Sequence, residues 1–179
     1  MSQKAIRRIS IAAILIIVLG LIGYFFVFKQ VYASTYVLIS DSSADKTLIN
    51  TPSPGADIDA VKIIHNEKSY YGERIASSNI LDGKKNNVSK YITPSSALGS
   101  PEDDDALTGY VSLGGGEIII EIPVIAKDGD TLTVYELGSS NSANADYYDV
   151  YTSDSPSGPW TLQKSSVSGM SESIIGESQ

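Results

Sequence analysis

Acidic side chains gather at three places in the sequence, and carboxylates at these spacings could bind a hard cation. Asp57 and Asp59 are two residues apart, so an extended strand would point both side chains the same way. An acidic run follows at 102–105, and Asp130 and Glu136 border a strand-like segment. Calcium takes about six to eight oxygen ligands from carboxylates and carbonyls. The candidate ligands of a structural calcium ion are Asp57, Asp59, Asp103, Asp104, Asp130 and Glu136. A solvated acidic surface would also explain any single cluster.

Few residues offer a catalytic arrangement. His65 is the only histidine and there is no cysteine, so a Ser–His–Asp triad would depend on His65. His65 ends a strand-like segment, where an exposed side chain is the simpler expectation. Paired carboxylates could hydrolyse glycosides, but no recognised glycosidase motif accompanies them. The run Gly114–Gly116 precedes a strand-like pattern rather than the helix of a phosphate loop. We therefore predict a non-catalytic protein, with a hydrolase as the weaker alternative.

Aromatic side chains could bind a sugar, because a ring face stacks on the apolar face of a pyranose. The candidate ligand-binding residues are Tyr70, Tyr71, Tyr147 and Tyr151. In the alternative interpretation, alternate members of these pairs belong to the core and the others to the surface.

Charge and composition restrict the class of partner. The chain has 13 basic and 21 acidic residues, and four of the basic residues precede position 34, so residues 34–179 carry nine basic against all 21 acidic side chains. Such a surface repels nucleic acid, and we predict no nucleic-acid partner. The absence of cysteine favours a bacterial or archaeal surface protein.

An uncharged apolar run of 20 residues, Ile9–Phe28, lies near the N-terminus. A helix of this length spans about 30 Å, the hydrocarbon thickness of a bilayer. Lys4, Arg7 and Arg8 precede the run, so the positive-inside rule places the N-terminus in the cytoplasm and the rest outside. We predict that residues 1–33 form a signal anchor in the cell membrane, or a signal peptide cleaved after Ala33 that leaves a secreted protein.

Residues 34–179 have the pattern of one all-β domain. Short β-branched and aromatic runs alternate with Gly, Pro, Ser, Asn and Asp turns, which is typical of a two-sheet antiparallel sandwich. The predicted strands are Tyr36–Ser40, Ile58–Ile64, Tyr70–Ile75, Val88–Ile92, Tyr110–Leu113, Glu117–Ile122, Thr131–Leu137, Tyr147–Thr152 and Trp160–Gln163. The polar stretch Gly138–Ala145 is predicted to be a mobile loop.

Four segments in the middle of the chain have a specific order. They are ALGSPEDD at 97–104, VSLGGGEIIIEI at 111–122, DGDTLTVYE at 128–136, and YDVYTSD at 148–154 followed by Gly158-Pro159-Trp160. Together they resemble a discoidin-like, galactose-binding-like jelly-roll module of bacterial and archaeal cell-surface proteins. The resemblance implies a jelly-roll sandwich, and it raises the expectation of a structural calcium ion, which that fold frequently holds.

The order of two further segments departs from such modules. In the modules, strands similar to YVLISD at 36–41 and GADIDAV at 55–61 follow the tryptophan, whereas here both come first. We therefore predict a circular permutation with the join near 65–70, in which both segments lie inside the same sandwich as Glu117–Ile122 and Thr131–Leu137. The alternative is that residues 34–64 remain from a preceding module and the last module is truncated.

These observations predict a membrane-anchored or exported module that binds a carbohydrate or another cell-surface component. A structural or assembly domain of a cell-envelope complex is the alternative function.

Overall fold

The computed structural model describes residues 34–42, 53–80, 91–102, 109–137 and 146–177. The chain divides into two units, Met1–Ala33 and Ser34–Gln179, and every described residue belongs to the second unit. The predicted N-terminal helix, the loop Gly138–Ala145 and residues 88–90 of one predicted strand lie outside the described residues.

The described residues form β-strands and one short 3-10 helix, η3 (Pro94–Ala97). The strands are β1 (Thr35–Asp41), β2 (Asp57–His65), β3 (Lys68–Tyr71), β4 (Arg74–Asn79), β5 (Val111–Ser112), β6 (Glu117–Ile122), β7 (Thr131–Glu136), β8 (Tyr148–Ser153), β9 (Thr161–Val167) and β10 (Ser171–Ile174).

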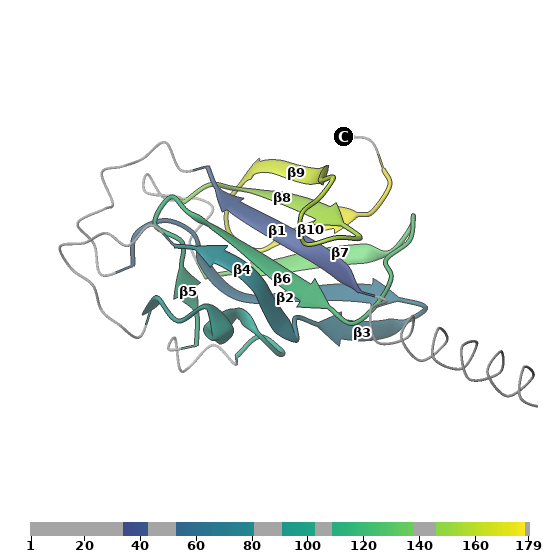
Figure 1. Cartoon of the computed structure of the whole chain (residues 1–179), viewed down its shortest axis with the longest axis horizontal. Coiled ribbons are helices and arrows are strands. Elements are labelled where there is room, and N and C mark those ends of the chain that lie inside the picture. The colour runs from purple at the N-terminus through teal and green to yellow at the C-terminus, as the bar shows by residue number, and fades with distance from the viewer. Residues whose placement is uncertain (1–33, 43–52, 81–90, 103–108, 138–145, 178–179) are drawn as a thin grey trace, which may run out of the picture. The chain divides into compact units, whose positions relative to one another are not determined.

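The strands make two antiparallel sheets, as Figure 1 shows. The first sheet has the order β4-β6-β1-β8-β9, and the second has the order β10-β7-β2-β3 with β5 beside β2. Buried residues of both sheets form one apolar core. The prediction of an all-β protein with two antiparallel sheets is confirmed, while the jelly-roll type stays a prediction.

Alternation along the strands explains how each sheet faces this core. In β6, Ile118, Ile120 and Ile122 are fully buried, whereas the residues between them are more exposed. In β7, Leu132 and Val134 enter the core as their spacing predicts. Successive side chains of a strand point to opposite faces, so one apolar residue in two is enough to define the buried face.

The two N-terminal segments of the domain lie inside this sandwich, as predicted. β1 pairs with β6 and β8, for example Val37 opposite Ile120, and β2 pairs with β7, with Val61 opposite Val134. The proposed join is a tight hairpin between β2 and β3, where Asn66 and Glu67 both have positive φ. Two such residues are typical of the hairpin turn that matches strand twist.

One predicted strand, Tyr70–Ile75, is two strands in different sheets. β3 belongs to the second sheet and β4 to the first, and the chain crosses between them at Gly72. Gly72 donates its N–H to Val61 O, and a Cβ there would lie 2.6 Å from Ile120 Cγ2. A residue with a side chain would therefore collide with the core at this crossing.

Other differences follow from weak local patterns. Tyr91 and Ile92 are not in a strand, although they end the predicted strand Val88–Ile92. β10 was not predicted, because its sequence SESI has a single apolar residue, and β9 extends beyond the predicted Trp160–Gln163. Both lie at sheet edges, where fewer apolar contacts are needed.

The Asp41 carboxylate ties two loops to the end of β1. Its Oδ2 accepts hydrogen bonds from Ala56 N at 3.1 Å and Gly115 N at 2.8 Å. Gly55 has φ +75°, and a Cβ there would overlap this carboxylate and lie 2.8 Å from Gly114 N. The position therefore needs glycine for both its backbone angle and its space.

We expect Gly55→Ala to lower the free energy of unfolding by about 2–3 kcal/mol, because left-handed strain adds to the loss of the Asp41 contacts. Gly129→Ala is the matched control, since Gly129 has φ +93° but nothing within 4 Å of its added Cβ. The control should cost only the left-handed backbone strain, about 1 kcal/mol. Urea denaturation of both variants measures the difference, and equal costs would show that Asp41 contributes nothing.

Candidate functional site

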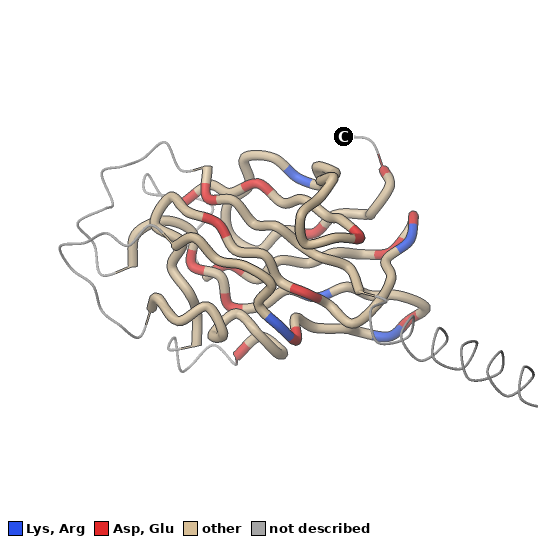
Figure 2. Tube along the Cα trace, in the orientation of Figure 1, with Lys and Arg blue, Asp and Glu red and all other residues tan. Residues whose placement is uncertain are grey.

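Acidic residues meet at one end of the sandwich, which we call the acidic end and define by Asp57, Asp59, Glu102, Ser112 and Glu136. Asp57 begins β2 and Glu136 ends the antiparallel neighbour β7, so pairing brings them together. Asp57 N donates to Glu136 Oε1 at 3.4 Å, and Ser112 Oγ donates to the Asp57 carboxylate. In Figure 2 the end of the sandwich near β5 has acidic positions and no Lys or Arg on its coloured trace.

Burial changes the protonation of these carboxyl groups. Loss of solvent raises the pKa of Asp57 to about 7, and the nearby charges of Glu136 and Asp146 act in the same direction against the hydrogen bonds from Ser112 and Ser53. Burial also raises the pKa of Asp59, which accepts a hydrogen bond from Glu102 N at 3.2 Å. The acidic end therefore holds carboxyl groups that ionise less readily than usual.

Two tyrosines adjoin the acidic end. Tyr110 is buried and stacks on Tyr91 with ring centroids 4.6 Å apart. Burial and the hydrogen bond with Tyr91 raise the pKa of Tyr110, so its hydroxyl stays protonated. The stacked rings and the network of buried polar groups stabilise the local structure of the acidic end, whether or not it also binds a ligand.

The six predicted calcium ligands do not form one group. Asp57, Asp59 and Glu136 lie at the acidic end, while Asp103 and Asp104 are outside the described residues. Asp130 lies just before the start of β7, whereas Glu136 ends this strand. The six-residue strand separates them by roughly 20 Å, so the two carboxylates cannot bind the same ion. Within the described part of the chain, no three His, Asp or Glu side chains converge to hold a metal.

Calcium at the acidic end remains testable in solution. If Asp59 and its neighbours bind the ion in the folded state alone, chelation should lower the melting temperature, with a loss of about 2.7 kcal/mol when calcium is at 100 times its Kd. Asp59→Asn should reproduce the effect of chelation, and Glu172→Gln on the exposed side of β10 should not. Equal melting temperatures in calcium and in chelator would contradict the calcium prediction.

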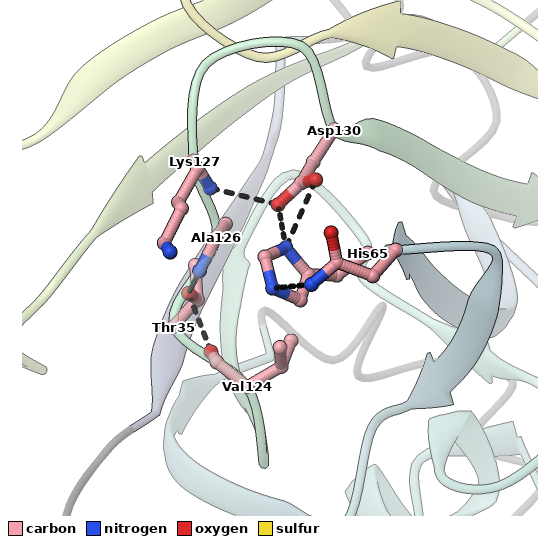
Figure 3. Close-up of polar contacts among 7 residues, drawn as sticks. Thr35, His65, Val124, Ala126, Lys127 and Asp130 are labelled. Atoms are coloured by element: carbon pink, nitrogen blue, oxygen red, sulfur yellow. Dashed lines mark hydrogen bonds and ion pairs between the residues drawn. The ribbon is translucent and has the colours of Figure 1, made fainter.

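His65 lies at the other end of β2 and is paired with Asp130, as Figure 3 shows. Its Nδ1 is 2.8 Å from Asp130 Oδ2, and Asn66 Nδ2 is 2.9 Å from its Nε2. The expectation of an exposed histidine is wrong, because the His65 side chain is only 15% exposed. Its contact with Asp130, just before β7, keeps it against the domain. Asn66 contacts Nε2, the nitrogen that the base of a Ser–His–Asp triad would use, and the His65–Asp130 pair connects the β2–β3 turn to the start of β7.

The loop between β6 and β7 is fixed on the same side of the molecule. Asp130 Oδ2 accepts a hydrogen bond from Lys127 N at 2.8 Å. Thr35 Oγ1 donates to Val124 O at 2.7 Å and accepts from Ala126 N at 2.8 Å, as Figure 3 also shows. The loop is therefore anchored by side chains from β1 and from its own end.

A cavity of about 270 Å³ opens beside this anchored loop. We call it the end pocket, and its lining residues are Thr35, Ala126, Thr152, Ser153, Asp154, Ser155, Gly158, Pro159, Thr161 and Ile175. Half of these ten residues carry a hydroxyl group, one carries a carboxylate, and the other four are small or apolar. No lysine or arginine is among the described residues that line the cavity.

No protein family model, curated protein or solved structure matches this chain. The function therefore has to be inferred from the site itself. In the part of the chain that the structure describes, there is no helix with the length and apolar character to cross a membrane, and Ile9–Phe28 lies outside that part.

The four candidate tyrosines do not gather at one site. Tyr70 and Tyr71 lie on β3, where Tyr70 packs against the core. Tyr151 is opposite Leu38 in the middle of the first sheet, and Tyr147 is 43% exposed just before β8. None of them lines the end pocket.

The end pocket has no distinctive signal in the sequence. Ser155–Pro159 has the composition of an ordinary turn, and indeed Gly158 N donates to Ser155 O. The hydroxyl residues have no distinctive spacing. The lining residues also come from distant parts of the sequence, from Thr35 to Ile175. Only the motif that includes Asp154 and Gly158-Pro159 contained a signal for this region.

Proposed function

We propose that the chain is a non-catalytic surface module that binds a carbohydrate in the end pocket. The observation that supports this proposal is a cavity with hydroxyl walls and small apolar contacts. Binding sites for small molecules are concave and combine apolar surface with a few placed polar groups. A cavity of about 270 Å³ is slightly below the usual range for drug-sized ligands and suits one sugar ring.

The hydroxyl groups of the pocket have capacity for a ligand. Thr152 Oγ1 accepts a hydrogen bond from Gln163 Nε2, and Ser153 Oγ accepts one from Ser155 N. A hydroxyl has one donor and two acceptor positions, so both can still donate to a sugar oxygen. Pro159 and Ile175 offer apolar contact to the C–H groups of the ring.

The pocket walls are held in place before a ligand arrives. Thr35 anchors the β6–β7 loop, and Ile175 N donates to Asp130 O at 2.9 Å, which ties the C-terminal segment to the same wall. A rigid site loses less conformational entropy on binding, so more of the contact free energy contributes to affinity.

Surface location belongs to the same proposal. Residues 9–28 would anchor the protein in the cell membrane with the domain outside, where it meets carbohydrate. Protease added to intact cells should then remove the domain. Protection of the domain until lysis would contradict this location.

A matched pair of substitutions on β9 tests the pocket. Thr161 lines the cavity and is exposed, whereas Leu162 is 50% exposed and points to the opposite face of the strand. Thr161→Phe should fill the cavity and abolish binding of the full-length chain to a glycan array in a detergent without sugar headgroups. Leu162→Phe should bind as the unmodified chain does. Unchanged binding by Thr161→Phe would refute the pocket, and the absence of any glycan signal would refute the proposed function.

A structural or assembly role is the second candidate function, and one observation favours it. Leu38 is opposite Ile119 on one side and Tyr151 on the other, and Tyr151 is opposite Leu162. These four residues form an apolar row across β6, β1, β8 and β9 on the face directed away from the core. Leu162→Glu should disrupt any assembly through this face, which size-exclusion chromatography with light scattering would detect.

A further inference from the structure

We propose that the end pocket prefers a sugar with a protonated amino group over the same sugar without one. This inference rests on the proposed function, because it specifies the ligand of the same pocket. Its basis is the charge of the lining: Asp154 is the one charged residue among the lining residues that the structure describes.

The Asp154 carboxylate is available to a ligand. The side chain is exposed, and no hydrogen bond or ion pair joins it to another residue in the described part of the chain. Lys127 and Lys164 belong to neighbouring segments, but neither lines the cavity. Among the described lining residues, the negative charge of Asp154 therefore has no positive partner.

Neighbouring hydroxyls define how a ring would lie against this charge. Thr152 and Ser153 are buried, and each can donate to a hydroxyl oxygen of the ring. Asp154 follows them directly in the chain and can accept from an ammonium group at the ring edge. A hydrogen bond with an ionised donor and acceptor is stronger than a neutral one.

The same charge disfavours other sugars. A neutral parent sugar lacks the ammonium group and gains only ordinary hydrogen bonds from Asp154. An acetamido group keeps the nitrogen but has no charge, and the carboxylate of a uronic acid would be repelled. The domain as a whole is acidic, which increases the repulsion of anionic ligands.

Titration of the full-length chain in detergent, followed by ligand-observed NMR, tests the preference. The probes are glucosamine and galactosamine, each with its parent sugar and its N-acetyl derivative, and glucuronate. At low salt and about pH 6 the amine is protonated. Each amino sugar should bind about three- to ten-fold more tightly than its parent, the range for a charge-assisted contact at an exposed position.

Two variants test whether Asp154 causes the preference for amino sugars. Asp154→Asn should remove the preference for the amine, measured as the ratio of the dissociation constants of the amino sugar and its parent within this variant. Glu172→Gln removes one negative charge from exposed β10 outside the pocket and should keep the preference. Raising the salt concentration should reduce the preference of the unmodified chain.

The outcomes separate this inference from the proposed function. Equal affinity for amino and parent sugars would overturn the inference and leave the carbohydrate pocket standing. A preference that survives in Asp154→Asn would show that Asp154 is not its source and would also overturn the inference. No binding of any probe would overturn both the inference and the proposed function.

Discussion

A chain without residues 34–64 is expected to be unfolded. This deletion removes β1, which lies between β6 and β8, and β2, which lies between β7 and β3. The fully buried side chains lost are Val37, Ile39, Ala56, Ile58, Ala60, Val61 and Ile63. Burial of a large aliphatic side chain contributes about 1.5–3 kcal/mol, so their sum approaches or exceeds the usual net stability of about 5–15 kcal/mol.

Circular dichroism and thermal melting of residues 68–179 measure this result. The matched control keeps every strand but changes their order: it starts at Glu67, continues to Glu177 and returns through a short linker to residues 34–66. Thr35 and Ile175 line the same cavity, so the two ends that the linker joins are close. The reordered chain should fold cooperatively. If residues 68–179 fold by themselves, the two segments are not part of one cooperative sandwich.

The second large effect expected is a pH dependence of stability caused by Asp57. Its pKa is about 7 in the folded chain and about 3.8 as an ordinary carboxyl, mainly because burial disfavours the charged form. Between about pH 4 and pH 7 the folded state therefore binds a proton that the unfolded state has lost. Stability falls as pH rises through this window, by up to about 4 kcal/mol.

Urea denaturation at pH 4.5 and pH 8, with chelator present, separates Asp57 from other groups. Asp57→Asn keeps an acceptor for Ser112 but cannot ionise, so it should be more stable than the unmodified chain at pH 8 and should remove most of the slope. Asp154→Asn, at an exposed position, should leave the slope unchanged. A slope that persists in Asp57→Asn would assign the pH dependence to another group.

At the acidic end, residue spacing alone predicted only part of the side-chain arrangement. Asp57 and Asp59 were expected to point the same way, but the β2–β7 pairing shifts register between Ile58 and Ala60. Asp57 then contacts Ser112, while Asp59 accepts from Glu102. A β-bulge inserts one residue and redirects a side chain, and its position depends on the partner strand.

The end pocket and the His65–Asp130 pair could not be predicted from the sequence. Both bring together residues from distant parts of the sequence, such as Thr35 with Ile175. The approach of such residues depends on strand order, and a pattern within one strand has no information about its neighbours in the sheet.

The sequence by itself determined the features that depend on neighbouring residues. These are the all-β class, the two antiparallel sheets and the positions of strands such as β6 and β7. Side chains alternate with a period of two in any strand, so the apolar pattern can be read before the partner is known. Tertiary structure decided the crossing at Gly72, the His65–Asp130 pair and the composition of the end pocket. Each of these depends on strand pairing and on contacts between residues far apart in the chain, which local patterns do not specify.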